Sequence, residues 1–287
     1  MATIPSRRFF TRHRTGASCW SVRCVAVSGL ALFAALLVGV ARAQQTGSAP
    51  TDAPPLDLSD PRAVEERADL YMVRKYYPEA VELYQRLTTL DGRNAAYYNK
   101  LGIAYHQLQE LGPAKKAYQK AVQLKPQYPE VINNLAAVQY AQKDYRGAIL
   151  TYLKALELSP GDAVIYSNLG TAYFAYKKFE YAMNSYRYAL LRDPMVFQRS
   201  GRSGNIVQQR NAGDMGAFNF YLAKTYAGMG DVEQTLLYLA KALEADYPEM
   251  RKQLSDPVFT FLAEEPRFLD LIAQLNTAEQ PRNSTSP

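Results

Sequence analysis

The stretch AVIYSNLGTAYFAYKKFEYAMNSYRYALLRDP, from Ala163 to Pro194, decides the fold. It contains two short amphipathic patterns, in which apolar residues recur every three or four positions. Small residues stand where two helices must approach each other, and large aromatic residues stand between them. Proline has no N–H to donate and disfavours helix in the residue before it, so the final proline ends the second helix. The stretch therefore predicts a pair of packed helices.

The same pattern recurs along the chain with a period of 34 residues. Aligned copies begin at residues 61, 95, 129 and 163, and a fifth begins at residue 216. Position 8 of the copies is always small: Ala68, Gly102, Ala136, Gly170 and Ala223. Position 24 is tyrosine in the first four copies: Tyr84, Tyr118, Tyr152 and Tyr186. Because one helix pair cannot bury its apolar faces alone, the copies must stack on each other, and these tyrosines are predicted to be core.

These repeats resemble the tetratricopeptide repeat family over roughly residues 61–249, because seven positions recur at one fixed period. With its N-terminal segment, the chain resembles the exported bacterial members. The resemblance implies an all-α fold, an α-solenoid of tetratricopeptide helix-turn-helix repeats with a concave, peptide-binding surface. The predicted organisation is a signal peptide or membrane anchor (1–43), a disordered linker (44–60), five repeats (61–94, 95–128, 129–162, 163–196 and 216–249), an insertion (197–215), C-terminal capping helices (250–276) and a disordered tail (277–287).

The N-terminal segment has the pattern of an export signal. It is basic, and it continues into an apolar run from Val25 to Ala41. The residues Ala41-Arg42-Ala43 then fit the small-x-small pattern of a cleavage site. The predicted location is therefore exported, either periplasmic or secreted. The alternative is an anchor in the inner membrane formed by residues 25–41, with the N-terminus in the cytoplasm.

The positive charge of the chain belongs to this N-terminal segment. The net charge is +6, and residues 1–43 contain six arginines and no acidic residue. From Gln44 onward, 27 basic residues match 27 acidic residues. A nucleic-acid-binding protein should keep its positive charge in the mature domain. We therefore expect no nucleic-acid partner, and membrane contact only through the N-terminal segment if it is uncleaved.

Residues that could perform chemistry are scarce after the first 43 positions. This region has no cysteine and one histidine, His106. Disulfides, thiolate zinc sites and cysteine nucleophiles are therefore excluded there. No phosphate-binding glycine loop and no acid–base pair of carboxylates is recognisable. We expect a protein that is not an enzyme, without a metal, a cofactor or a small-molecule substrate.

The resemblance also implies where a partner binds. In this family, side chains on the first helix of each repeat line the concave groove. The candidate groove residues are Asn99, Ile103, His106, Gln107, Asn133, Asn134, Ala137, Tyr140, Ser167, Asn168, Thr171 and Phe174. Asn134 and Asn168 resemble the asparagine ladder that grips a peptide backbone in some members, since an amide both donates and accepts. The alternative is packing, because asparagine before Leu-Gly is frequent in the family.

The insertion between the fourth and fifth repeats leaves two interpretations open. It contains Arg199, Arg202 and Arg210, so it could form a basic lid, built as a short β-hairpin, over the groove. The alternative is a tolerated surface insertion.

The predicted function is a non-catalytic scaffold that mediates protein–protein interaction in the bacterial cell envelope by binding a peptide or helix in its groove. The alternative is an accessory subunit of an envelope assembly, secretion or enzyme complex. The sequence does not name the partner.

Overall fold

The computed structural model describes residues 55–198 and 212–277. Within these ranges every regular element is a helix, which confirms the predicted all-α fold. The chain divides into a unit of residues 1–47 and a unit of residues 48–287, and the elements below belong to the second unit. The predicted signal peptide or anchor and the segments 199–211 and 278–287 lie outside the described residues. Among the described helices, none has the length and apolar character needed to cross a membrane.

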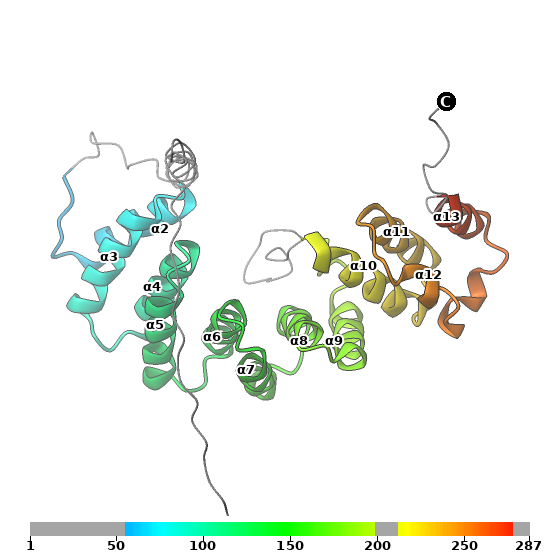
Figure 1. Cartoon of the computed structure of the whole chain (residues 1–287). Coiled ribbons are helices and arrows are strands. Elements are labelled where there is room, and N and C mark those ends of the chain that lie inside the picture. Colours follow the sequence, from blue (N-terminus) through cyan, green and yellow to red (C-terminus); the bar gives the residue numbers. More distant parts are fainter. Residues whose placement is uncertain (1–54, 199–211, 278–287) are drawn as a thin grey trace, which may run out of the picture. The chain divides into compact units, whose positions relative to one another are not determined.

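Four helix pairs follow one another along the chain (Figure 1). They are α2 (Pro61–Val73) with α3 (Tyr77–Leu90), α4 (Ala95–Gln107) with α5 (Leu111–Leu124), α6 (Pro129–Ala141) with α7 (Tyr145–Leu158), and α8 (Ala163–Ala175) with α9 (Phe179–Arg192). Their first helices start 34 residues apart. The second helix of each pair also contacts the first helix of the next pair. The described part of the chain is therefore an α-solenoid of stacked helix pairs.

A fifth pair and a helical cap follow. The pair consists of α10 (Ala212–Ala227) and α11 (Val232–Glu244), so α10 begins four residues before the predicted start of the fifth repeat. The cap consists of α12 (Met250–Gln253), the 3-10 helix η2 (Pro257–Leu262) and α13 (Pro266–Thr277). Because η2 contacts α10 and α13 contacts α11, these elements cover the last pair and complete the apolar core.

The turn inside each pair has one recurring geometry. Position 15 of all five repeats has a positive φ of 58° to 76°, and the five residues there are Lys75, Gln109, Lys143, Lys177 and Gly230. The next N–H donates to the carbonyl five residues earlier, for example Lys178 to Tyr173 at 2.9 Å. This is a Schellman motif, which satisfies carbonyls at the end of the first helix. Residues on either side of the turn are thus placed alike in each repeat.

The position-24 tyrosines fill the space between the two helices of a pair. Tyr84, Tyr118, Tyr152 and Tyr186 are 2% exposed or less, which confirms their predicted place in the core. A Cβ atom added at Gly170 would lie 2.5 Å from the ring of Tyr186, and one added at Gly102 would lie 2.6 Å from the ring of Tyr118. Position 8 is small because this ring occupies the space beside it.

Polar side chains connect neighbouring repeats in a series that we call the interrepeat ladder. Each contact joins position 6 of one repeat to position 5 of the repeat before it. The contacts are Lys100 Nζ to Glu65 Oε1 at 2.7 Å, Asn134 Nδ2 to Asn99 Oδ1 at 3.1 Å, and Asn168 Nδ2 to Asn133 Oδ1 at 3.0 Å. The ladder sets the register of neighbouring repeats at three successive interfaces, because a hydrogen bond requires a defined position of both partners.

The folded region begins earlier than the predicted boundary at residue 60. Leu56 packs against the core of the first repeat, and the carbonyl of Leu58 accepts a hydrogen bond of 2.9 Å from Arg86 Nε. Both residues belong to the stretch that we predicted as linker. An apolar side chain with a place in the core outweighs the linker-like composition around it.

A pair of substitutions at position 24 should change stability in opposite directions. Tyr152 is fully buried, and its hydroxyl finds no hydrogen-bond partner among the described residues. Because a buried unsatisfied hydroxyl is unfavourable, Tyr152→Phe should raise the free energy of unfolding by about 1 kcal/mol. The hydroxyl of Tyr84 donates to Asp69 Oδ1 at 2.6 Å, so Tyr84→Phe should lower it by about 1–2 kcal/mol. Urea unfolding followed by circular dichroism measures both. Equal effects of the two substitutions would contradict the assignment of the hydroxyl groups.

Candidate functional site

The predicted groove residues differ widely in exposure. Seven of the twelve are buried, namely Asn99, Asn133, Ala137, Ser167, Asn168, Thr171 and Phe174. Ile103, His106, Asn134 and Tyr140 are half-buried, and Gln107 is exposed. Ser167, Asn168 and Thr171 are 0% exposed, which does not agree with a role as an open contact surface. Short polar side chains reach their own helix instead, as Thr171 Oγ1 does by donating to the Ser167 carbonyl at 3.0 Å.

The asparagines of the groove bind to one another across the repeats. Asn134 and Asn168 donate to Asn99 and Asn133 in the interrepeat ladder, and Asn133 donates to Asn134 at 3.5 Å. An amide engaged in this way offers fewer groups to a peptide backbone. The side-chain N–H groups of Asn134 and Asn168 thus join neighbouring repeats. This geometry fits the alternative that the two asparagines serve packing and do not bind a peptide.

His106 lies at the end of α4 with part of its ring enclosed. Its Nε2 atom is buried and has no hydrogen-bond partner among the described residues. Burial lowers the pKa of His106 below its usual value, because the charged imidazolium is poorly solvated there. The folded protein therefore keeps this ring neutral at a pH where the unfolded chain would protonate it.

This shift predicts a pH dependence of stability. Below a pH of about 6.5 the unfolded chain binds a proton at His106 that the folded state does not, so the free energy of unfolding should fall as the pH is lowered from that value. The fall should end at the lowered pKa of the folded state. His106→Gln should remove this slope between about pH 7 and pH 5.5. Urea midpoints of both proteins across this range test the expectation, and identical slopes would contradict it.

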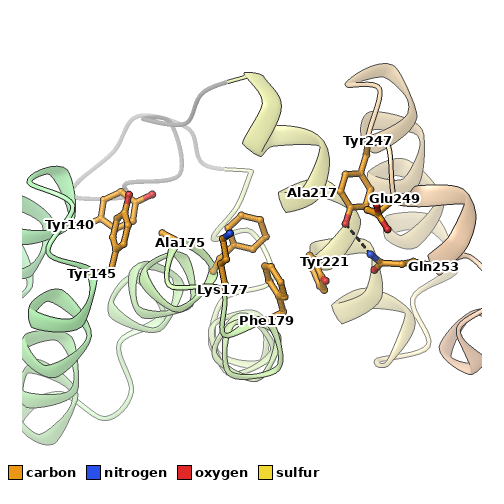
Figure 2. A pocket seen from close by; sticks show the side chains of 11 residues that line it. Tyr140, Tyr145, Ala175, Lys177, Phe179, Ala217, Tyr221, Tyr247, Glu249 and Gln253 are labelled. Carbon is orange, nitrogen blue, oxygen red and sulfur yellow. Dashed lines mark hydrogen bonds between the residues drawn. The ribbon is translucent and has the colours of Figure 1, made fainter. Parts of the chain in front are cut away.

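A pocket of about 530 Å³ lies among the ends of several helices (Figure 2). Its lining, which we call the aromatic pocket, consists of Tyr140, Tyr145, Phe174, Ala175, Lys177, Phe179, Ala217, Tyr221, Tyr247, Glu249 and Gln253. Six of these are aromatic. Tyr140 and Phe174 are the two predicted groove residues in the lining, and the structure does not bring the other ten predicted residues to it.

The aromatic walls follow from the repeated turn geometry. Tyr140 and Tyr145 occupy positions 12 and 17 of the third repeat, with ring centroids 5.4 Å apart. Phe174 and Phe179 occupy the same positions of the fourth repeat, at 5.5 Å. Phe179 also stacks on Tyr221 of α10 at 4.4 Å with an interplanar angle of 9°. These contacts fix the rings on both sides of the insertion and leave the pocket preformed.

The ends of the aromatic pocket carry different polar groups. Tyr247 accepts a hydrogen bond of 3.0 Å from Gln253 Nε2, drawn as a dashed line in Figure 2. Burial raises the pKa of both Tyr221 and Tyr247, so their hydroxyls remain neutral donors and acceptors. Lys177, on the α8–α9 turn, and Glu249, just before α12, are both exposed and carry opposite charges. The pocket thus combines aromatic walls with tyrosine hydroxyls, one basic group and one acidic group.

Sequence reasoning missed most of this lining. The spacing of 34 residues between Tyr145 and Phe179, each five residues after an aromatic residue, was a signal that could have found the walls. Tyr221, Tyr247 and Glu249 carry no such signal. Their place depends on how α10 and α12 pack after the insertion, which no local pattern specifies.

Metal-binding clusters are absent from the part of the chain that the structure describes: no three His, Cys, Asp or Glu side chains gather there in a metal-binding arrangement. Several carboxylates in the described ranges serve as helix caps or ion-pair partners. Asp162 accepts from the N–H groups of Val164 and Ile165, and Glu233 pairs with Arg267 at 2.8 Å.

Comparison with protein families identifies the repeats. The family model described as "TPR repeat" matches residues 68–109 and 139–177, and the model described as "Tetratricopeptide repeat" matches residues 95–128. The matched ranges fall on α2 to α8, which belong to the helix pairs that repeat every 34 residues.

Individual known proteins share either a short segment or a low sequence identity with this chain. The general transcriptional corepressor trfA of Dictyostelium discoideum is 31% identical over 61 residues, which are 21% of this chain and 4% of that protein, so the chain spans a small part of this relative. A structure of MamA from Desulfovibrio magneticus RS-1 is 17% identical, with a TM-score of 0.48, and covers 66% of this chain and 96% of that chain. YrrB, described as a TPR protein with an unusual peptide-binding site, is 17% identical, with a TM-score of 0.44, covering 72% and 93%.

Proposed function

Because the chain is a tetratricopeptide-repeat protein, we propose that it is a non-catalytic scaffold that binds a segment of another protein in the aromatic pocket. The observation that carries this proposal is the lining of the pocket, where six aromatic side chains surround about 530 Å³. Pockets of this size that are lined by aromatic side chains together with polar groups are typical binding sites. Aromatic residues also dominate the energetics of protein–protein contacts, because they bury a large area and lose little side-chain entropy.

The rigidity of the site supports a binding role. The rings of Phe174, Phe179 and Tyr221 contact one another, with centroids 4.4 to 5.9 Å apart. A partner segment would therefore meet walls that are already in place, and binding would require little ordering of the scaffold. The lining consists of six aromatic side chains, two alanines, one lysine, one glutamate and one glutamine, a composition that suits contact with a protein segment.

The cellular setting is a further part of the proposal. The basic start of the chain, the apolar run 25–41 and the Ala41-Arg42-Ala43 pattern support export to the bacterial cell envelope, as a periplasmic or secreted protein. N-terminal sequencing of the protein recovered outside the cytoplasm tests this. A sequence beginning at Gln44 is expected, and recovery of the uncleaved chain in the inner membrane would overturn it in favour of an anchor.

The binding function is tested with the full-length protein carrying a C-terminal tag. Tyr145→Ala removes one wall of the aromatic pocket, and Tyr188→Ala is the matched control on the exposed face of α9. Proteins recovered with the wild type from an envelope fraction should be reduced at least tenfold by Tyr145→Ala and unchanged by Tyr188→Ala, since a buried aromatic anchor contributes about 2 kcal/mol or more. If both variants retain the same partners as the wild type, the pocket is not the binding site.

A further inference from the structure

We propose, on the basis of the proposed function, that the aromatic pocket selects the charge order of its peptide. The occupant is an extended segment of a partner protein with an apolar side chain between an acidic and a basic one. The acidic side chain faces Lys177, and the basic side chain faces Glu249. The apolar side chain enters the aromatic centre.

The middle of the pocket fits an apolar anchor. Ala175 and Ala217 are small and half-buried, so they leave space between the larger rings. Phe174, Phe179 and Tyr221 surround this space with ring faces and edges. An apolar side chain placed there loses its contact with water and gains contacts with several rings, which is the main source of affinity in such sites.

The basic end of the pocket is held in a defined position. Lys177 stands at position 15 of its repeat, where the Schellman turn fixes the backbone at a φ of 58°. Its side chain is exposed, and the described residues contain no ion pair with it. Figure 2 shows it close to Phe179, between Tyr145 on one side and Tyr221 on the other. The ammonium group is therefore available to an acidic side chain of a partner.

The acidic end lies at the start of α12. Glu249 is the residue before this helix, and it is exposed, with no ion pair to any residue of the described ranges. Burial raises the pKa of Tyr221 and Tyr247, and the Glu249 carboxylate adds to this in the same direction. Figure 2 shows Glu249 beside Tyr247 and Gln253, across the pocket from Lys177. A basic side chain of the partner finds its counter-charge at this end.

Two opposite charges at separate places in the lining, Lys177 near Phe179 and Glu249 beside Tyr247, give the pocket a direction. A segment with the matching charge order gains two favourable pairs. The reversed order, bound in the same chain direction, places like charges together at both positions. Each exposed pair contributes little alone, but replacing two favourable pairs by two like-charge contacts should alter the affinity about tenfold. Charge order thus provides specificity, whereas the aromatic rings provide affinity.

The test compares peptides selected by the full-length wild type with those selected by the double variant Lys177→Glu/Glu249→Lys. A displayed library of random peptides serves as the probe for both proteins. We expect selected peptides with acidic and basic residues on opposite sides of an apolar residue, and the inverted order for the variant. Each protein should bind its own peptides about tenfold more tightly than those of the other. Selection of the same peptides by both proteins would overturn the inference.

Matched controls separate this inference from the proposed function. Lys143→Glu changes the equivalent turn lysine of the preceding repeat, which lies outside the pocket lining, and should leave the selected peptides unchanged. Both changed residues are exposed, so the helical content of the variant should equal that of the wild type. The peptides could lose affinity for Tyr145→Ala while their affinity for the double variant Lys177→Glu/Glu249→Lys equals that for the wild type. In that case the pocket binds peptides without selecting their charge order. If Tyr145→Ala has no effect either, the proposed function fails as well.

Discussion

Replacing Tyr186 by alanine should lower the free energy of unfolding by about 3–5 kcal/mol, the range for removal of a large buried aromatic side chain. Tyr186 is 0% exposed and joins three parts of the structure. Its ring lies against Gly170 of α8, and it makes edge-to-face contacts with Phe197 at 5.3 Å and Phe218 of α10 at 5.6 Å. Alanine would leave a cavity where the fourth repeat meets the fifth.

The same helix provides a control for this prediction. Tyr188 is two residues further along α9, 51% exposed, and stacks on Tyr166 at a centroid distance of 5.4 Å. Tyr188→Ala removes an equally large side chain from the surface and should cost less than about 1 kcal/mol. Urea unfolding of the two variants measures the difference. Similar losses of stability would mean that Tyr186 does not have the packing role described here.

Adding a single methyl group at Gly170 should also destabilise the fold, by about 1–3 kcal/mol. The new Cβ atom would lie 2.5 Å from the ring of Tyr186 and 3.1 Å from the carbonyl oxygen of Ala182. Alanine is the better helix former by about 1 kcal/mol, so the steric term must exceed that gain for the prediction to hold. Tyr186 can move little, because Phe197 and Phe218 pack against the ring.

Gly112→Ala is the matched control, since no atom lies within 4 Å of the added Cβ there. It should leave stability unchanged within about 0.5 kcal/mol or raise it slightly. Thermal unfolding midpoints followed by circular dichroism compare the two glycines. A stabilised Gly170→Ala variant would contradict the steric argument. Position 8 of the third repeat is already alanine, Ala136.

The fold was predictable because its determinants are local and repeated. Gly170 and Tyr186 are 16 residues apart, and the same combination of a small residue and a tyrosine recurs in four copies at one period. Such a pattern specifies one helix pair, and repetition specifies the stacking. The exact start of α10 was not predictable, because the insertion before it interrupts the period.

The site was predictable only where it follows the repeat. Tyr140 and Phe174 were found from their position in the repeat, and they do line the aromatic pocket. Ser167 and Thr171 were selected by the same rule, yet they are fully buried. A position number indicates the side of a helix, but neighbouring elements decide whether that side is open. Tyr247 and Glu249 come from the cap, where no repeat applies.

The interrepeat ladder has a consequence for the order in which the modules of this chain can be joined. Its first interface uses an ion pair, between Lys100 and Glu65, whereas the next two use amide pairs. A chain shortened by residues 129–162 would place Asn168 opposite Asn99 and so keep an amide pair at the new junction. A chain shortened by residues 95–128 would instead remove Lys100 and leave Glu65 and Asp69 without their shared cation. The repeats look alike in sequence, but only some of them can be exchanged or deleted without losing a polar pair between the newly joined repeats.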